Sequence, residues 1–201
     1  MTPAFDGSLI DGSAYRGIVT LAHGSPAWLD GLVAAWSTYG LAVFAVLMVV
    51  AWWQTRRESA PAALVALAGP LTVVVAYAVN DALKLVVRED RPCRSLRLVT
   101  LEACPAPGDW SFPSNHAAVA AASAVVLLYV SRRLGAAAAV AAGAMAASRV
   151  WVGVHYPHDV VAGVLVGALV ALVLSESLRR RREAAARRLA ATRLRPLLTT
   201  S

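Results

Sequence analysis

The strongest constraint on the fold is the way in which apolar residues gather in long blocks. Hydrophobic residues make up 58% of the 201-residue chain and charged residues only 15%, and the mean hydropathy is +0.59. The blocks approach the length that crosses a bilayer as a helix, and they lack the narrow apolar stripe of a soluble amphipathic helix. We therefore predict an all-α, polytopic transmembrane helical bundle with five spanning helices, or six as the alternative. The five expected spans are residues 39–55, 61–87, 114–130, 135–152 and 157–178.

The two ends of the chain differ from these blocks. Near the amino terminus the apolar stretches are short and interrupted by Gly24 and Pro26, which favours amphipathic helices lying in the membrane interface. The other end alternates arginine pairs with alanine and leucine. The predicted organisation is an interfacial segment (1–38), a transmembrane domain (39–178) and a basic tail (179–201).

Orientation is predicted from the short basic loops. With five spans, 56–57, 132–133 and the tail fall on one side, which the positive-inside rule assigns to the cytoplasm. Most of the net charge of +7 lies in the tail, so anionic lipid headgroups, not nucleic acid, are the expected counter-charge. Residues 88–113 and 154–159 then face outward. Four arginines of this outer loop depart from the rule and suggest an anionic substrate: Arg88, Arg91, Arg94 and Arg97.

Three polar clusters stand at the outward ends of the predicted spans. They are the stretch 84–92, the stretch 113–116 and the stretch 148–159. Ionisable residues at membrane depth are costly to bury and are markers of functional sites. Each alone has an ordinary explanation, such as a lysine that reaches the headgroups or an interfacial histidine. Three clusters on one face of the membrane indicate a shared site.

The cations in these clusters suit the binding of a phosphate. Lys84, Arg91 and Arg149 would neutralise the phosphate and the charge that develops in its transition state. Ser114 opens a predicted helix, so its hydroxyl and the backbone N–H groups that follow, beginning with Asn115, would add further donors.

The remaining residues of the clusters supply a nucleophile and an acid. His155 would attack phosphorus and form a phosphohistidine, while Asp159, four residues later, would orient the other ring nitrogen. His116 would protonate the leaving oxygen and then activate water. No carboxylate cluster in the sequence suggests a divalent metal, so neither a metal nor another cofactor is expected.

These clusters resemble the signature of the type 2 phosphatidate phosphatase superfamily, which includes lipid phosphate phosphatases and vanadium haloperoxidases. The family pattern is a lysine, six residues and Arg-Pro, then Pro-Ser-Gly-His, then Ser-Arg, five residues, His, three residues and Asp. The chain follows this pattern over 84–92, 113–116 and 148–159. The resemblance implies a metal-independent enzyme with His155 as the nucleophile and His116 as the general acid. It also implies a set of phosphate-binding residues: Lys84, Arg91, Ser114 and Arg149.

One position departs from the family pattern, because Asn115 stands where glycine is usual. Asparagine tolerates a left-handed backbone, and its side chain would add a donor to the phosphate site. This residue, the short chain and the interfacial first segment are more similar to the bacterial undecaprenyl-diphosphate phosphatase branch. The expected activity is therefore hydrolysis of the terminal phosphate of an isoprenoid diphosphate, at the outer face of a bacterial plasma membrane.

Other functions stay open at this point. The same site would serve phosphatidate, phosphatidylglycerophosphate or a phosphorylated sugar carried on polyprenol. A non-catalytic lipid-phosphate binder or a transporter would need the cations but not His116, His155 and Asp159. Vanadate-dependent peroxidation is a property of soluble relatives, whereas this chain is strongly apolar. His158 adjoins the site by position alone and is left out of the catalytic set.

The two cysteines, Cys93 and Cys104, lie in the outer loop. In an oxidising compartment they are expected to form a disulfide, with two free thiols as the alternative. The bond would close a loop of about a dozen residues and stabilise it by roughly 3 kcal/mol.

Overall fold

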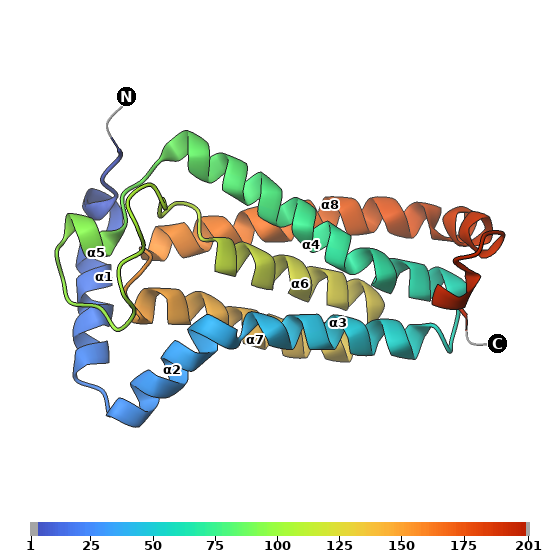
Figure 1. The fold of residues 1–201 in the computed structure, drawn as a ribbon, viewed down its shortest axis with the longest axis horizontal. Coiled ribbons are helices and arrows are strands. Elements are labelled where there is room, and N and C mark those ends of the chain that lie inside the picture. Colours follow the sequence, from blue (N-terminus) through green and yellow to red (C-terminus); the bar gives the residue numbers. More distant parts are fainter. Residues whose placement is uncertain (1–3, 200–201) are drawn as a thin grey trace.

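The helices of the chain run side by side along one long axis, and one helix lies across their end (Figure 1). The structure is a computed structural model that describes residues 4–199. Within that range the only β-structure is an isolated bridge between Phe5 and Glu89. The helices are α1 (Ser8–His23), α2 (Ala27–Tyr39), α3 (Leu41–Thr55), α4 (Ala60–Val87), α5 (Pro92–Ser95), α6 (Asn115–Val130), α7 (Arg132–Trp151), α8 (Pro157–Ala190) and the 3-10 turn η1 (Arg195–Leu197).

Helix α6 forms the centre of the bundle and packs against α3, α4, α7 and α8. Its sequence is rich in alanine, and most of its side chains are buried. Gly163 and Gly167 on α8 let the two backbones approach closely. A Cβ atom added at these glycines would lie 2.4 Å from the carbonyl oxygen of Ser114 and 2.1 Å from that of Ala118. Small residues therefore hold α8 against the start of α6, as they do in other membrane bundles.

The helices begin at residues that favour helix starts. The Ser59 side chain accepts a hydrogen bond from the backbone N–H of Ala62 at the start of α4, and Ser131 accepts one from Leu134 at the start of α7. Pro157 occupies the first turn of α8, where the missing N–H costs nothing. Of these three helix starts, that of α8 adjoins a polar cluster, because Pro157 lies between His155 and Asp159.

Fewer helices than the five predicted spans are long and apolar enough to cross a membrane. Within residues 4–199, α4, α7 and α8 are each long and apolar enough to cross a membrane. α2 and α3 qualify only as a pair, bent by 54°. α6 is a shorter apolar helix of 16 residues, about 24 Å long. The structure is all-helical as predicted, with three clear spans and up to four, and the count of five stays a prediction.

The two end segments both pack against the bundle. Helix α1 lies across one end of the bundle (Figure 1) and contacts α7, α8 and α5. The predicted boundary at residue 38 falls in the last turn of α2. At the other end, α8 continues beyond residue 178 to Ala190. The chain then folds back so that Leu198 is buried and the Trp52 indole donates to the carbonyl of Leu197, 2.9 Å away.

Candidate active site

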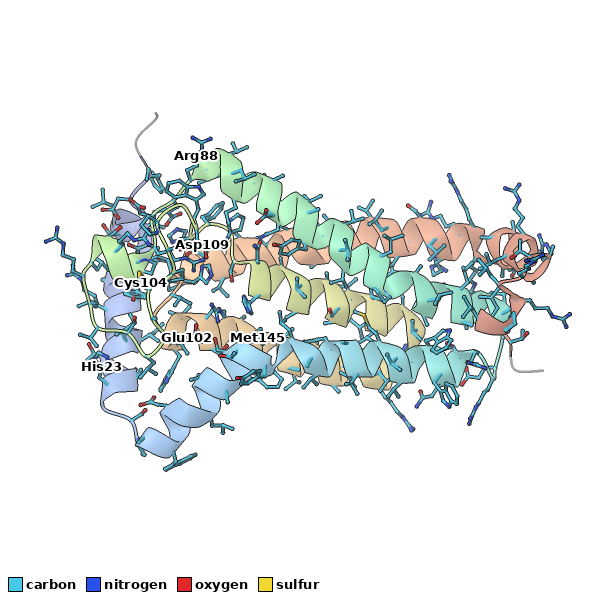
Figure 2. All side chains as sticks on the ribbon, in the orientation of Figure 1. His23, Arg88, Glu102, Cys104, Asp109 and Met145 are labelled. Carbon is cyan, nitrogen blue, oxygen red and sulfur yellow. A yellow bond between two sulfur atoms is a disulfide. The ribbon has the colours of Figure 1, made fainter. Side chains whose placement is uncertain are left out.

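The predicted site residues all lie at the end of the bundle that α1 crosses. They come from the last turn of α4, the 88–114 loop, the first turn of α6, the last turn of α7 and the turn before α8. In Figure 2, Glu102, Cys104 and Asp109 of the loop are labelled at this end. Within this region six predicted residues are almost completely buried: Lys84, Arg91, Ser114, Arg149, His155 and Asp159. The turn before α8 contains Gly153 at φ +88°, a backbone conformation suited to glycine.

His155 and Asp159 form the hydrogen-bonded pair that their spacing predicts. The Nδ1 atom of His155 lies 3.2 Å from Oδ2 of Asp159. The same carboxylate oxygen accepts a hydrogen bond from the backbone N–H of Tyr156 at 2.8 Å and another from the hydroxyl of Ser111. With three donors around it, the carboxylate is fixed in place and holds the imidazole in one orientation.

The other ring nitrogen of His155 is turned toward a cation. Arg91 Nη1 lies 3.1 Å from Nε2 of His155 and also donates to the carbonyl of Val154 at 2.9 Å. Because a guanidinium has no acceptor, Nε2 must offer its lone pair, and the proton of the ring is then on Nδ1. Burial, followed by the charges of Arg91, Arg149 and Lys84, holds the pKa of His155 well below its usual value. The imidazole is therefore neutral near pH 7, as a nucleophile must be.

Two loop carboxylates contact the cations of the site. Asp109 Oδ1 lies 2.8 Å from Nη2 of Arg91 and 3.8 Å from Nζ of Lys84. Glu102 Oε2 lies 3.3 Å from Nη1 of Arg149. Arg149 also donates to the hydroxyl of Ser37, on α2. The three predicted cations are thus each within ion-pair distance of an acidic residue that the motif spacing does not contain.

Ser114 and the start of α6 present further donors. The backbone N–H of Ser114 donates to the carbonyl of Asp159 at 3.0 Å, so the starts of α6 and α8 are joined. The Ser114 side chain does not cap its own helix, and its buried oxygen has no hydrogen-bond partner within residues 4–199. A buried hydroxyl without a partner beside three cations suits an anionic ligand. His116 lies in the first turn of α6 and is partly buried.

Asn115 is the first residue of α6, and its backbone is not left-handed. Its side chain is turned to α4, where Oδ1 accepts a hydrogen bond from Asn80 at 2.7 Å and Nδ2 donates to Asp81 at 3.1 Å. The amide thus joins α4 to α6 through Oδ1 and one N–H of Nδ2.

The additional arginines of the loop are not in the centre of the site. Arg88 is exposed and donates to the carbonyl of Leu85, and Arg97 is exposed as well. Arg94 donates to the carbonyl of Pro105, within the loop itself. A disulfide joins Cys93 and Cys104, whose Cα atoms lie 5.9 Å apart. These contacts fold the loop that carries Glu102 and Asp109.

Four site residues escaped the sequence analysis: Ser37, Glu102, Asp109 and Ser111. Three of them lie in the irregular loop, where no periodicity relates a position to the site. The only available signal was charge balance, because a loop with four arginines near a buried site needs acidic partners. Asn80 and Asp81 had a clearer signal, since two polar residues stand inside an apolar helix one turn before Lys84.

Asp109 competes with an anionic ligand for Lys84 and Arg91. We expect Asp109→Asn to strengthen the binding of inorganic phosphate by about three- to tenfold, because it removes the negative charge that lies next to these two cations. The measurement is the inhibition constant of phosphate at constant pH. Asp90→Asn is the matched control, because Asp90 is a carboxylate of the same loop and has no ion pair within residues 4–199. An unchanged or weaker affinity in Asp109→Asn would refute this account.

The buried cations, the oriented histidine and the apolar helices define an integral membrane phosphatase. The chain belongs to the PAP2 superfamily, whose sequence model matches residues 63–183. The chain is 27% identical over 156 residues to undecaprenyl-diphosphatase BcrC of Bacillus subtilis, covering 78% of each chain. It is 35% identical over 136 residues to decaprenylphosphoryl-5-phosphoribose phosphatase of Mycobacterium tuberculosis, covering 67% of this chain and 70% of the relative.

The fold is also similar to a solved structure. The crystal structure of Aquifex aeolicus LpxE superposes with a TM-score of 0.67 at 22% identity, covering 87% of this chain and 99% of the other. At this identity the likeness concerns the fold alone. Together with the family match and the phosphatase relatives, it makes this chain a membrane lipid phosphatase.

Proposed function

We propose that the chain hydrolyses the terminal phosphate of an undecaprenyl-type diphosphate through a phosphohistidine at His155. The observation that carries the mechanism is the orientation of that ring, with Nδ1 against Asp159 and Nε2 facing Arg91. In the first step Nε2 bonds to phosphorus and the bond to the leaving oxygen breaks, with His116 giving that oxygen a proton. In the second step His116 takes a proton from water, which displaces His155 and releases inorganic phosphate.

The electrostatic part of the reaction is assigned to the fixed cations. Lys84, Arg91 and Arg149 would hold the equatorial phosphate oxygens, and the Ser114 hydroxyl would add a donor. Preorganised charges in a buried site stabilise the transition state without reorganising when the reaction occurs. Three fixed cations can supply the charge neutralisation that a metal supplies elsewhere, so we propose a metal-independent mechanism.

An apolar groove on the side of the bundle, which approaches the site at its α6 end, supports a substrate with a long hydrocarbon chain. It has a volume of about 370 Å³ and is lined by α3, α4 and α6. On α6 the groove is lined by Val119 and Ser123, and Val119 lies three positions after His116, about 4.5 Å along the helix. A lipid whose phosphate is bound at the helix ends could therefore lay its hydrocarbon chain along this side of the bundle. The wall on α3 and α4 is mostly apolar and includes Leu41, Phe44, Met48, Ala66, Pro70 and Val73.

The choice among lipid substrates is supported by the relatives. The diphosphatase relative covers more of the chain, whereas the phosphoribose phosphatase relative is more identical over a shorter range. The arginines that suggest an anionic substrate in the sequence, Arg88, Arg94 and Arg97, lie outside the centre of the site. A polyprenyl-linked phosphosugar is therefore the second candidate. An outward-facing site and a cytoplasmic tail are part of the proposal, supported by the positive-inside rule.

The test is phosphate release by the purified protein in the presence of EDTA. We expect the highest kcat/KM with undecaprenyl diphosphate, compared with phosphatidate, phosphatidylglycerophosphate and decaprenylphosphoryl-5-phosphoribose. Activity should be unchanged by EDTA, because no step uses a metal. Higher kcat/KM with another lipid would refute the substrate, and activity lost in EDTA and restored by a divalent cation would refute the metal-independent mechanism.

A further inference from the structure

His158 is the centre of a charged cluster beside the proposed nucleophile, in which Glu89 is buried and His158 and Asp11 are partly buried. Its Nδ1 atom lies 2.8 Å from Oδ1 of Asp11 on α1, and its backbone N–H donates to Oδ2 of the same residue at 2.7 Å. Its Nε2 atom lies 3.0 Å from Oε1 of Glu89. The ring is stacked on that of Tyr156, with centroids 5.3 Å apart. The side chain therefore joins three segments that are far apart in sequence.

The contacts define the charge of the ring. Carboxylate oxygens only accept hydrogen bonds, so a histidine with a carboxylate at each ring nitrogen carries a proton on both, as an imidazolium. Such a ring has no lone pair for a metal. This argues against reading Glu89, His158 and Asp159 as a metal site, although their ligand atoms lie within 4.8 Å of one another.

Glu89 depends on this cation. Its side chain is 1% exposed, and within residues 4–199 the only basic group at ion-pair distance is His158. Asp159 is close as well, since its Oδ1 lies 3.5 Å from Nε2 of His158. Removal of one partner of a buried ion pair leaves an uncompensated charge, which is strongly destabilising for the local structure.

The position of Glu89 matters because its neighbours are in the site. Arg91 follows two residues later, and the carbonyl of Glu89 accepts a hydrogen bond from the backbone N–H of Ser111 at 2.7 Å. Ser111 in turn donates to Asp159. The ion pair between His158 and Glu89 thus fixes a segment that presents a phosphate-binding arginine and supports the orienting carboxylate.

Helix α1 is held at two places around this segment. Asp11 binds His158, and the buried hydroxyl of Tyr15 donates to the carbonyl of Gly153 at 2.8 Å, in the turn that leads to His155. Phe5 adds the β-bridge to Glu89, with its N–H donating to the carbonyl of Arg88 at 3.1 Å. The amino-terminal segment is therefore packed against both sides of the nucleophile turn.

We propose that His158 is a positioning residue which, as an imidazolium between Asp11 and Glu89, holds Arg91 in its phosphate-binding place and fastens α1 to the site. The proposal rests on the proposed function only in that Arg91 binds the phosphate of the substrate. The groups that face the ring are Asp11 from α1, Glu89 from the loop after α4, and Asp159 and Tyr156 from its own segment.

The test compares His158→Gln with the double variant His158→Gln/Glu89→Gln. The single variant leaves Glu89 buried without a cation, and we expect KM and the inhibition constant of inorganic phosphate to rise at least about tenfold. The double variant removes both charges and retains groups that can form a hydrogen bond, so both constants should return to within about threefold of wild type. His23→Gln is the matched control, because it changes an exposed histidine at the end of α1.

The two constants separate positioning from general stability. Partial unfolding lowers the amount of active protein, and hence Vmax, but leaves KM and the phosphate constant unchanged. A lower Vmax alone in His158→Gln, or a double variant no better than the single one, would overturn the proposal. Direct calorimetric binding of phosphate to the three proteins gives the same comparison without turnover. Absence of turnover in wild type would count against the proposed function while this binding comparison still decides the role of His158.

Discussion

Substitution of His155 by glutamine is expected to lower phosphate release at least about 10⁴-fold and to abolish the phosphoenzyme. The variant keeps a polar side chain beside Asp159 but has no ring nitrogen to attack phosphorus. The cations and the Ser114 hydroxyl remain, so the affinity for inorganic phosphate should change little in comparison. The measurement is single-turnover hydrolysis of ³²P-labelled substrate, with the labelled protein isolated under alkaline conditions, in which phosphohistidine is stable.

The pH dependence of this step gives a second check on the same residue. Because burial and nearby cations lower the pKa of His155, the ring stays neutral as the pH falls below 6.5, the usual histidine value. Protonation of His155 should therefore not slow the formation of wild-type phosphoenzyme between pH 7 and pH 6. His23→Gln serves as the control.

A phosphoenzyme that persists in His155→Gln would show that another residue is the nucleophile.

Replacement of His116 by glutamine is expected to lower turnover by about 10²–10⁴-fold, with a loss that depends on the leaving group. A general acid is needed for an alkoxide or a lipid phosphate, but much less for p-nitrophenolate, which leaves without a proton. Formation of the phosphoenzyme from p-nitrophenyl phosphate should be nearly normal in this variant. Hydrolysis of the phosphoenzyme should be slow, because in the proposed mechanism His116 also activates the attacking water. The phosphoenzyme should therefore accumulate.

This accumulation distinguishes the two histidines. In a rapid-quench experiment, His116→Gln should show a burst of p-nitrophenolate followed by slow turnover, whereas His155→Gln should show no burst. An equal loss with lipid and p-nitrophenyl substrates, without accumulation of phosphoenzyme, would contradict the acid–base role of His116. Asp159→Asn tests the orienting role in the same assay, since an amide can present its N–H to Nδ1 and favour the wrong tautomer.

The helical class and the grouping of the polar clusters were open to prediction from the sequence. Apolar blocks set the helices, and the structure brings residues of all three motifs to one end of the bundle. The bend between α2 and α3 was not predictable in this way, because hydropathy reports the length of an apolar run and not its direction. Whether the 16-residue α6 crosses the membrane depends on bilayer thickness, which the sequence does not contain.

The site was predictable only where its residues follow fixed spacing. His155 and Asp159 are four residues apart in the sequence, so their pairing is local and could be anticipated. Asp109 and Glu102 reach their arginines from an irregular loop, and their contacts depend on the whole tertiary fold. Asn115 shows a further limit, because its amide was expected at the phosphate but contacts α4. The orientation of this amide is set by its hydrogen bonds to Asn80 and Asp81, which lie 35 and 34 residues earlier in the sequence.

The close backbone contact between α6 and α8 has a consequence for how such chains diverge. The separation of Ser114 from Asp159 is set where Gly163 and Gly167 meet main-chain atoms, so it does not depend on which large side chains cover the bundle. Residues that face lipid can therefore change during evolution while the distance between the reacting groups is kept. The modest identity of the chain to its relatives, 27% and 35%, is compatible with such divergence.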